Sequence, residues 1–151
     1  MTVESISGFE IRTDLAYNMD THMWVEVRSP ECVRIGMDAL GLETSGTLAQ
    51  LQFVGVGQSV DRNSDIGSLE AEKFVGPLLS PLSGTIIAVN QSAAELPSLV
   101  ERDPFGDGWM LELAPTDLTE ELSELASSRD DIVAEFTRKV AQYRRDGVLA
   151  E

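Results

Sequence analysis

The chain has 151 residues, 42% of them hydrophobic, which is the size of one ordinary globular domain. Its 26 acidic and 11 basic side chains give a formal net charge of −15, and this charge argues against sequence-independent binding of nucleic-acid phosphates or anionic lipid, since both need a basic face. The charge favours a protein that docks on basic surfaces of larger partners, or one from a salty or alkaline habitat.

The amino-terminal segment and the sparse Cys and His content limit location and chemistry. The N-terminus lacks the basic and apolar regions of a secretory signal, and no apolar run approaches the length that spans a membrane. Cys32 is the single cysteine and His22 the single histidine, so neither an intramolecular disulfide nor a Cys/His metal cluster can form. We therefore expect a cytoplasmic protein without a metal site, in which Cys32 is a buried small hydrophobe.

From Trp24 to about Val89 the chain consists mostly of short apolar or alternating runs separated by Gly, Ser, Asn and Asp, which is typical of short strands and tight turns. The predicted strands are 23–27, 32–36, 47–54, 66–71, 75–80, 84–89 and 109–113. Short helices are expected over 37–42 and over 92–100, where Pro97 interrupts the second. A turn over 103–109 is expected to anchor Trp109 in the core. The body is therefore predicted to be mainly β.

Beyond Pro115 the pattern becomes helical. Asp117 and Glu120 are spaced like a capping box, which predicts a helix start there. A further helix is predicted over 130–145, with an acidic start, a basic end and Gly147 after it. Its apolar face is expected to cover the β body and consists of Ile132, Val133, Phe136, Val140 and Tyr143. We divide the chain into a β domain, 1–115, and C-terminal helices, 116–151, packed on the same domain.

The stretch from Ile66 to Gly84 has the clearest chemical meaning. Two strand-like runs flank the charged pair Glu72-Lys73, at the point where the chain should reverse. The side chain of a turn residue lies in solvent, so a modifying enzyme can reach the amine of Lys73 while the flanking strands hold its backbone. A flexible lysine stem on a rigid turn is what a tethered prosthetic group needs in order to visit several active sites.

This stretch resembles the attachment hairpin of lipoyl domains, and the surrounding chain resembles the H-protein family of the glycine cleavage system. In that family a Glu precedes the modified lysine by three residues and a Gly follows it by eleven, as Glu70 and Gly84 do about Lys73. The resemblance covers residues 15–113 and, in outline, the helical tail. Further matches, in the family's order, are His22-Met23-Trp24-Val25, Ser80-Pro81-Leu82-Ser83-Gly84, Val89-Asn90 and Asp103-Pro104-Phe105-Gly106-Asp107-Gly108-Trp109.

The resemblance implies a barrel-sandwich hybrid lipoyl domain: mainly β (α+β), a flattened barrel of two small sheets with short helices and a C-terminal helical tail. It implies that lipoate is joined by an amide to Lys73, and that Glu70 and Gly84 are recognised by the lipoylating enzyme. His22 is expected to be a structural or surface histidine, and it is also a candidate lining residue of a cradle for the reduced arm.

The residues next to Lys73 bear on the cofactor and on the pathway. Biotin carriers share the fold but set the modified lysine between two methionines, whereas here the neighbours are Glu72 and Phe74, which favours lipoate. H proteins follow the lysine with Ala-x-Ser-Asp, whereas this chain has Phe74-Val75-Gly76-Pro77. That pattern resembles the lipoate-binding proteins of the sulfur-oxidising heterodisulfide-reductase-like system, relatives of H proteins in which the dithiolane is thought to carry sulfur between enzymes.

We therefore expect a lipoyl carrier of sulfur oxidation, with two alternatives: a glycine cleavage H protein carrying the aminomethyl group in glycine decarboxylation, and an unmodified H-like adaptor. The implied partners are lipoate ligase or lipoyl-synthesis enzymes, and either a heterodisulfide-reductase-like complex or the glycine cleavage enzymes. We expect a monomer with neither nucleic acid nor membrane as partner. Because no Ser/His/Asp or Cys/His set, phosphate loop or close carboxylate pair emerges, we expect a non-catalytic carrier rather than an enzyme.

Overall fold

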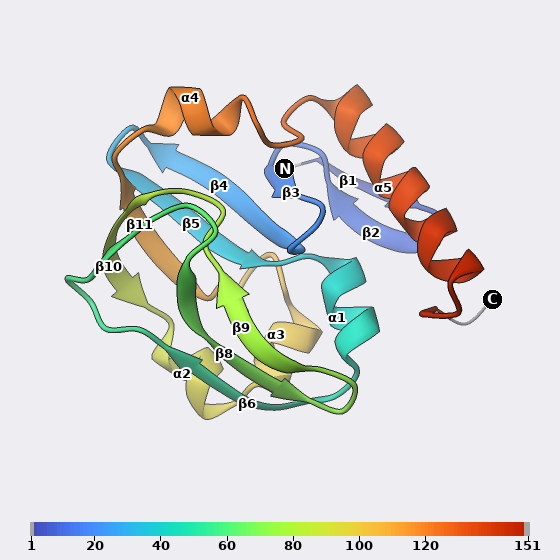
Figure 1. Cartoon of the computed structure of the whole chain (residues 1–151), viewed down its shortest axis with the longest axis horizontal. Coiled ribbons are helices and arrows are strands. Elements are labelled where there is room, and N and C mark those ends of the chain that lie inside the picture. The colour runs from blue at the N-terminus through green and yellow to red at the C-terminus, as the bar shows by residue number, and fades with distance from the viewer. Residues whose placement is uncertain (1, 150–151) are drawn as a thin grey trace.

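The computed structural model describes residues 2–149, which form three antiparallel sheets and five helices (Figure 1). The largest sheet has six strands in the order β3-β4-β5-β11-β10-β7. These strands are β3 (Ala16–Asn18), β4 (Met23–Ser29), β5 (Cys32–Met37), β11 (Leu111–Pro115), β10 (Gly84–Val89) and β7 (Ser59–Val60). A second sheet has the order β6-β8-β9 and consists of β6 (Leu48–Phe53), β8 (Asp65–Ala71) and β9 (Val75–Leu79). A third consists of β1 (Val3–Ile6) and β2 (Phe9–Arg12).

The main core lies between the six-stranded and the three-stranded sheets. In β8, Leu69 and Ala71 are buried while Ser68 and Glu70 are exposed, because successive side chains of a strand point to opposite faces. Leu51 of β6 lies opposite Leu69 and is buried with it. Other fully buried members of this core are Val33, Ile35, Ile66, Leu82, Ile86, Met110, Leu111 and Leu113. This arrangement confirms the predicted mainly β fold with short helices and a C-terminal helix.

The amino-terminal hairpin β1–β2 and the strands β3 and β7 were not among the predicted elements. The β1–β2 turn consists of Ser7 and Gly8, both with positive φ, and Ile6 pairs with Phe9 across it. Two central residues with positive φ give the two-residue turn whose twist suits a hairpin. A serine tolerates that conformation less well than Asn or Gly does, and the flanking runs are only four residues long. The sequence signal for this hairpin is correspondingly weak.

Helix α5 (Arg129–Arg145) confirms the long C-terminal helix and begins one residue before the predicted start. Its N-cap is Ser128, whose hydroxyl accepts a hydrogen bond from the N–H of Asp131. Its apolar face covers a second core, formed with the β1–β2 hairpin and the outer side of β3 and β4, rather than the space between the two larger sheets (Figure 1). This core contains Ile6, Ile11, Leu15, Tyr17, Trp24, Leu40, Ile132, Phe136 and Val140.

The short helices are α1 (Ala39–Ser45), α2 (Gln91–Glu95), α3 (Ser98–Arg102) and α4 (Leu118–Leu122). Pro97 separates α2 from α3, as predicted for the interrupted helix. The predicted capping box is wrong, because the side chain of Asp117 makes no capping hydrogen bond at α4. Glu121 of α4 instead accepts hydrogen bonds from the backbone N–H and hydroxyl of Ser83, at 2.8 and 2.7 Å, and ties α4 to the start of β10.

Two further expectations about burial are corrected by the structure. Cys32 is only partly buried at the start of β5, where desolvation is the largest cause that raises the pKa of its thiol. Trp109 is partly exposed, and the guanidinium carbon of Arg34 lies 4.5 Å from its ring centroid. The fully buried residue of this segment is Met110. The 103–109 turn therefore places Met110 in the core and leaves the indole of Trp109 at the edge of the core.

Strand β11 ends at Pro115, and α4 and α5 follow it. The last two residues of the predicted C-terminal segment lie outside the described residues. Within residues 2–149, none of the helices combines the length and the apolar character needed to cross a membrane.

The guanidinium of Arg12 is almost completely buried beside two carboxylates. Its Nη2 donates to Oδ2 of Asp14 at 2.6 Å and to Oε2 of Glu26 at 3.3 Å. The hydrogen bond from Arg12 is the largest cause that lowers the pKa of Asp14. A carboxyl group with a lowered folded-state pKa stabilises the fold above its unfolded pKa, and this stabilisation is lost as pH falls through the folded pKa.

Replacing Asp14 with asparagine is therefore expected to lower the free energy of unfolding by about 1 kcal/mol at neutral pH, a small figure because the carboxylate is partly exposed. The difference between wild type and Asp14→Asn should shrink toward zero as the pH falls through the lowered folded-state pKa of Asp14. Urea unfolding of both proteins over a pH series from neutral into acid measures this. An undiminished difference in acid would contradict the role given to the ion pair.

Candidate functional site

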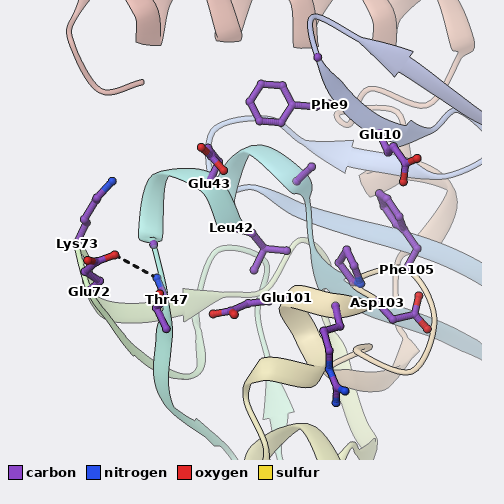
Figure 2. A pocket seen from close by; sticks show the side chains of 15 residues that line it. Phe9, Glu10, Leu42, Glu43, Thr47, Glu72, Lys73, Glu101, Asp103 and Phe105 are labelled. Atoms are coloured by element: carbon purple, nitrogen blue, oxygen red, sulfur yellow. Dashed lines mark hydrogen bonds between the residues drawn. The ribbon is translucent and has the colours of Figure 1, made fainter. Parts of the chain in front are cut away.

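Lys73 lies in the tight turn that joins β8 to β9. Glu70 pairs with Val75 across the hairpin, and the N–H of Ala71 donates to the carbonyl of Phe74 at 2.8 Å, which closes the turn. The side chain of Lys73 is exposed and extends away from the ribbon (Figure 2). Among residues 2–149 its amine has neither a hydrogen-bond nor an ion-pair partner. The turn therefore presents a primary amine to solvent.

The backbone of this turn is fixed to the end of α1. The N–H of Lys73 donates to the carbonyl of Ser45 at 2.8 Å, and the N–H of Glu72 donates to the carbonyl of Thr47 at 2.9 Å. Between them Gly46 has a φ of 76°, and a Cβ atom there would lie 2.7 Å from Oε1 of Glu72. The hairpin tip is thus held rigidly while the lysine side chain remains free. Sequence reasoning missed this anchor, whose one local signal is a glycine after a short helix.

The sequence contains one other lysine, Lys139 of α5, and its environment is different. Its amine donates to Oδ1 of Asp20 at 2.9 Å and lies 5.6 Å from the ring centroid of Tyr143. Its side chain is 19% exposed. The two lysine amines therefore differ sharply, because one is free at a turn and the other is engaged on a helix.

Glu70 and Gly84, the two residues predicted to take part in ligase recognition, lie in different sheets. Glu70 is exposed on the outer face of the three-stranded sheet, between Gln50 of β6 and Val75 of β9. Gly84 is the first residue of β10 in the six-stranded sheet and is buried, and a Cβ atom there would overlap the carbonyl oxygen of Ala114. Close packing is therefore a structural reason for glycine at this position.

His22 connects the β3–β4 turn with two helices. Its Nε2 lies 2.7 Å from the hydroxyl of Tyr143 on α5, and its Nδ1 lies 3.5 Å from Oδ1 of Asp38. Asp38 is fully buried and caps α1 by accepting the N–H of Gly41 at 2.8 Å. Burial is the largest cause that raises the pKa of Tyr143, so its hydroxyl stays protonated at neutral pH. His22 thus holds the turn against both helices, and its positive φ of 63° reflects the tight bend of the backbone at this turn.

Two hollows flank the hairpin turn. The smaller is a cavity of about 280 Å³ between β9, α1 and the β3–β4 turn, and His22 and Phe74 both line it. The larger is an open groove of about 650 Å³, with Lys73 at its edge (Figure 2). The groove is lined in part by Phe9, Glu10, Leu42, Glu43, Glu72, Glu101, Asp103 and Phe105.

Several carboxylates of the larger groove serve the fold itself. Glu72 accepts the N–H of Thr47 at 3.5 Å, and Glu101 accepts the N–H of Leu48. Asp103 accepts the N–H of Asp107 at 2.9 Å. The surroundings of Lys73 therefore consist of an exposed amine, a small cavity beside it and a groove lined by carboxylates. Among the described residues, no nucleophile lies next to a base there.

Comparison with known proteins gives one consistent family. The family model described as Glycine cleavage H-protein matches residues 15–138. The glycine cleavage system H protein of Crocosphaera subtropica is 36% identical over 121 residues, covering 80% of this chain and 90% of that protein. That of Nitratidesulfovibrio vulgaris is 34% identical over 124 residues, covering 82% and 95%. The crystal structure of the H protein from Mycobacterium marinum superposes with a TM-score of 0.66 at 29% identity, covering 76% of this chain and 98% of that one.

Proposed function

The chain belongs to the glycine cleavage H-protein family, and from this membership we propose that it is the lipoyl carrier of a glycine cleavage system, with lipoate attached to Lys73. Proteins of this family are non-catalytic carriers with lipoate bound covalently to a lysine. The observation that carries the proposal is the amine of Lys73, exposed and unpartnered within the described residues on a turn whose backbone is fixed by Ser45 and Thr47.

The physical task of such a carrier is to keep one reactive group near several enzymes. When bound, lipoate supplies a dithiolane that can be reduced to two thiols and can accept a one-carbon unit. A tether on Lys73 replaces free diffusion of that group with a high local concentration at each docked partner. The anchored turn confines the tether's origin, so the flexible part of the assembly begins at the lysine side chain.

The proposed partners are the enzymes of glycine cleavage and the ligase or synthesis enzymes that install lipoate. The formal charge of −15 suits transient docking on basic surfaces of these larger proteins. Glu70 stands exposed on the outer face of the hairpin, where an acylating enzyme could contact it while Lys73 enters its active site. The proposal keeps the cytoplasmic location expected from the sequence.

The cavity beside the turn is proposed to receive the arm when it is not engaged with a partner. His22 lines this cavity, and its ring is already hydrogen-bonded to Tyr143. We therefore propose that it shapes the cavity and does not act as an acid or a base. The cavity volume of about 280 Å³ lies near the lower end of the range for small-molecule sites.

A lipoyl carrier of sulfur oxidation is the second candidate, favoured by Phe74-Val75-Gly76-Pro77 after the lysine. The relatives found by comparison are named as glycine cleavage H proteins, which places this candidate second. Genes for heterodisulfide-reductase-like subunits and a dedicated lipoate ligase next to this gene would support it, whereas neighbouring glycine decarboxylase genes would argue against it. The unmodified adaptor is the third candidate, and a chain that resists lipoylation would support it.

Exchange of the glycine carboxyl group with bicarbonate tests the first candidate. We expect the lipoylated chain to support this exchange with its cognate glycine decarboxylase, and the unmodified chain to give only background, because the cargo is carried by the dithiolane. A lipoylated H protein of known activity serves as the positive control for the decarboxylase. If that control is active and the fully lipoylated chain stays at background, glycine cleavage is the wrong pathway for this carrier.

A further inference from the structure

The ring of Phe74 folds back onto the strand that follows it. A Cβ atom on Gly76 would lie 2.8 Å from Cζ of Phe74 and within 3.5 Å of both neighbouring ring carbons. Gly76 lies inside β9 and does not have a positive φ, so its backbone conformation does not require glycine. Glycine inside a strand usually marks the close approach of another group. Here that group is the end of the Phe74 ring.

This ring also lines the smaller cavity beside the hairpin turn. Phe74 and Leu78 contribute from the hairpin, and Met37, Gly41 and Thr44 contribute from the opposite side. Two lining residues are ionisable, and both are already engaged. The carboxylate of Asp20 is largely exposed and bonded to Lys139, and the ring of His22 is bonded to Tyr143. The lining therefore suits an uncharged and largely apolar occupant.

Phe74 is joined directly to Lys73, whose backbone N–H donates to the carbonyl of Ser45. A group attached to the Lys73 amine therefore starts next to Phe74, which lines the cavity. Resting on the proposed lipoylation of Lys73, we propose that Phe74 is the side chain that closes this cavity over the uncharged dithiol end of the reduced, docked arm. Gly76 gives the ring the space it needs to take that position.

The test measures how well the cavity protects the arm. The chain is lipoylated, its dithiolane is reduced, and the new thiols are alkylated with iodoacetamide over time. Peptide-level mass spectrometry then separates the arm on Lys73 from the thiol of Cys32. We expect Phe74→Ala to accelerate alkylation about three- to tenfold, the effect of removing one aromatic contact from the docked state. Gly76→Ala, which displaces the ring, should act in the same direction.

Val75→Ala is the matched control, because Val75 lies between these two residues, is 75% exposed and faces the outer side of the sheet with Glu70. It should alkylate at the wild-type rate, and all variants should keep the wild-type thermal midpoint within a few degrees. Wild-type rates in lipoylated Phe74→Ala and Gly76→Ala, or equal acceleration in Val75→Ala, would overturn this inference alone. Failure of the wild-type chain to gain a lipoyl mass would overturn the proposed function and this inference with it.

Discussion

Replacing Lys73 with arginine is expected to abolish lipoylation completely and to leave the fold intact. Arginine keeps the positive charge and the length of the side chain, but its guanidinium stays protonated and does not form the amide. The side chain of Lys73 makes no hydrogen bond or ion pair within the described residues, so the fold loses no contact with it. Intact mass after incubation with a lipoate ligase, ATP and lipoate should show one lipoyl addition for wild type and none for Lys73→Arg.

Lys139→Arg is the matched control, since the chain contains these two lysines and no others. Its amine is held by Asp20, so wild-type and Lys139→Arg proteins should gain the same single lipoyl mass. A lipoyl addition that persists in Lys73→Arg would move the site to Lys139 and refute the carrier proposal as stated.

Glu70→Gln tests ligase recognition. If the ligase binds this carboxylate, it should modify the variant several-fold more slowly than wild type and to the same final mass.

The hairpin at the centre of this site could be predicted because its signals are local. The strand-like run that ends at Ala71 indicates a strand, and the charged pair before Phe74 marks the reversal. The long helix was equally accessible, because its caps and its apolar face lie within one continuous segment. The predicted bounds of β8, β9 and α5 therefore lie within one or two residues of the observed ones, because these elements depend on residues close together in sequence.

The anchor of the turn could not be predicted, because Lys73 and Ser45 meet only after α1 and the hairpin have packed. The hydrogen bonds of Glu121 to Ser83 could not be predicted for the same reason, since the two residues are far apart in sequence and meet by tertiary packing. The Phe74–Gly76 contact does leave a trace in the sequence, as a large side chain two residues before a mid-strand glycine. The contact can be inferred from that pattern only when the side of the strand on which the Phe74 ring lies is known.

The strongest destabilisation is expected from Gly84→Ala. A methyl group there would overlap the carbonyl oxygen of Ala114 and lie 2.9 Å from Cγ of Leu113, and both neighbours belong to the paired strand β11. Because the obstacle is backbone rather than the end of a flexible side chain, the strand pairing itself has to shift. We expect a loss of about 3 kcal/mol, which corresponds to a thermal midpoint lower by roughly 6 to 12 °C.

Gly55→Ala is the matched control, since Gly55 is exposed and nothing lies within 4 Å of a Cβ atom there. It should unfold within a few tenths of a kcal/mol of wild type. Equal midpoints for Gly84→Ala and wild type would contradict the close approach to Ala114. Lipoylation of Gly84→Ala at a temperature where it remains folded then separates its two possible roles. An unchanged lipoylation rate would mean that Gly84 serves packing alone. A slower rate, with the β8–β9 hairpin still folded, would mean that the ligase also recognises the backbone conformation that this glycine allows.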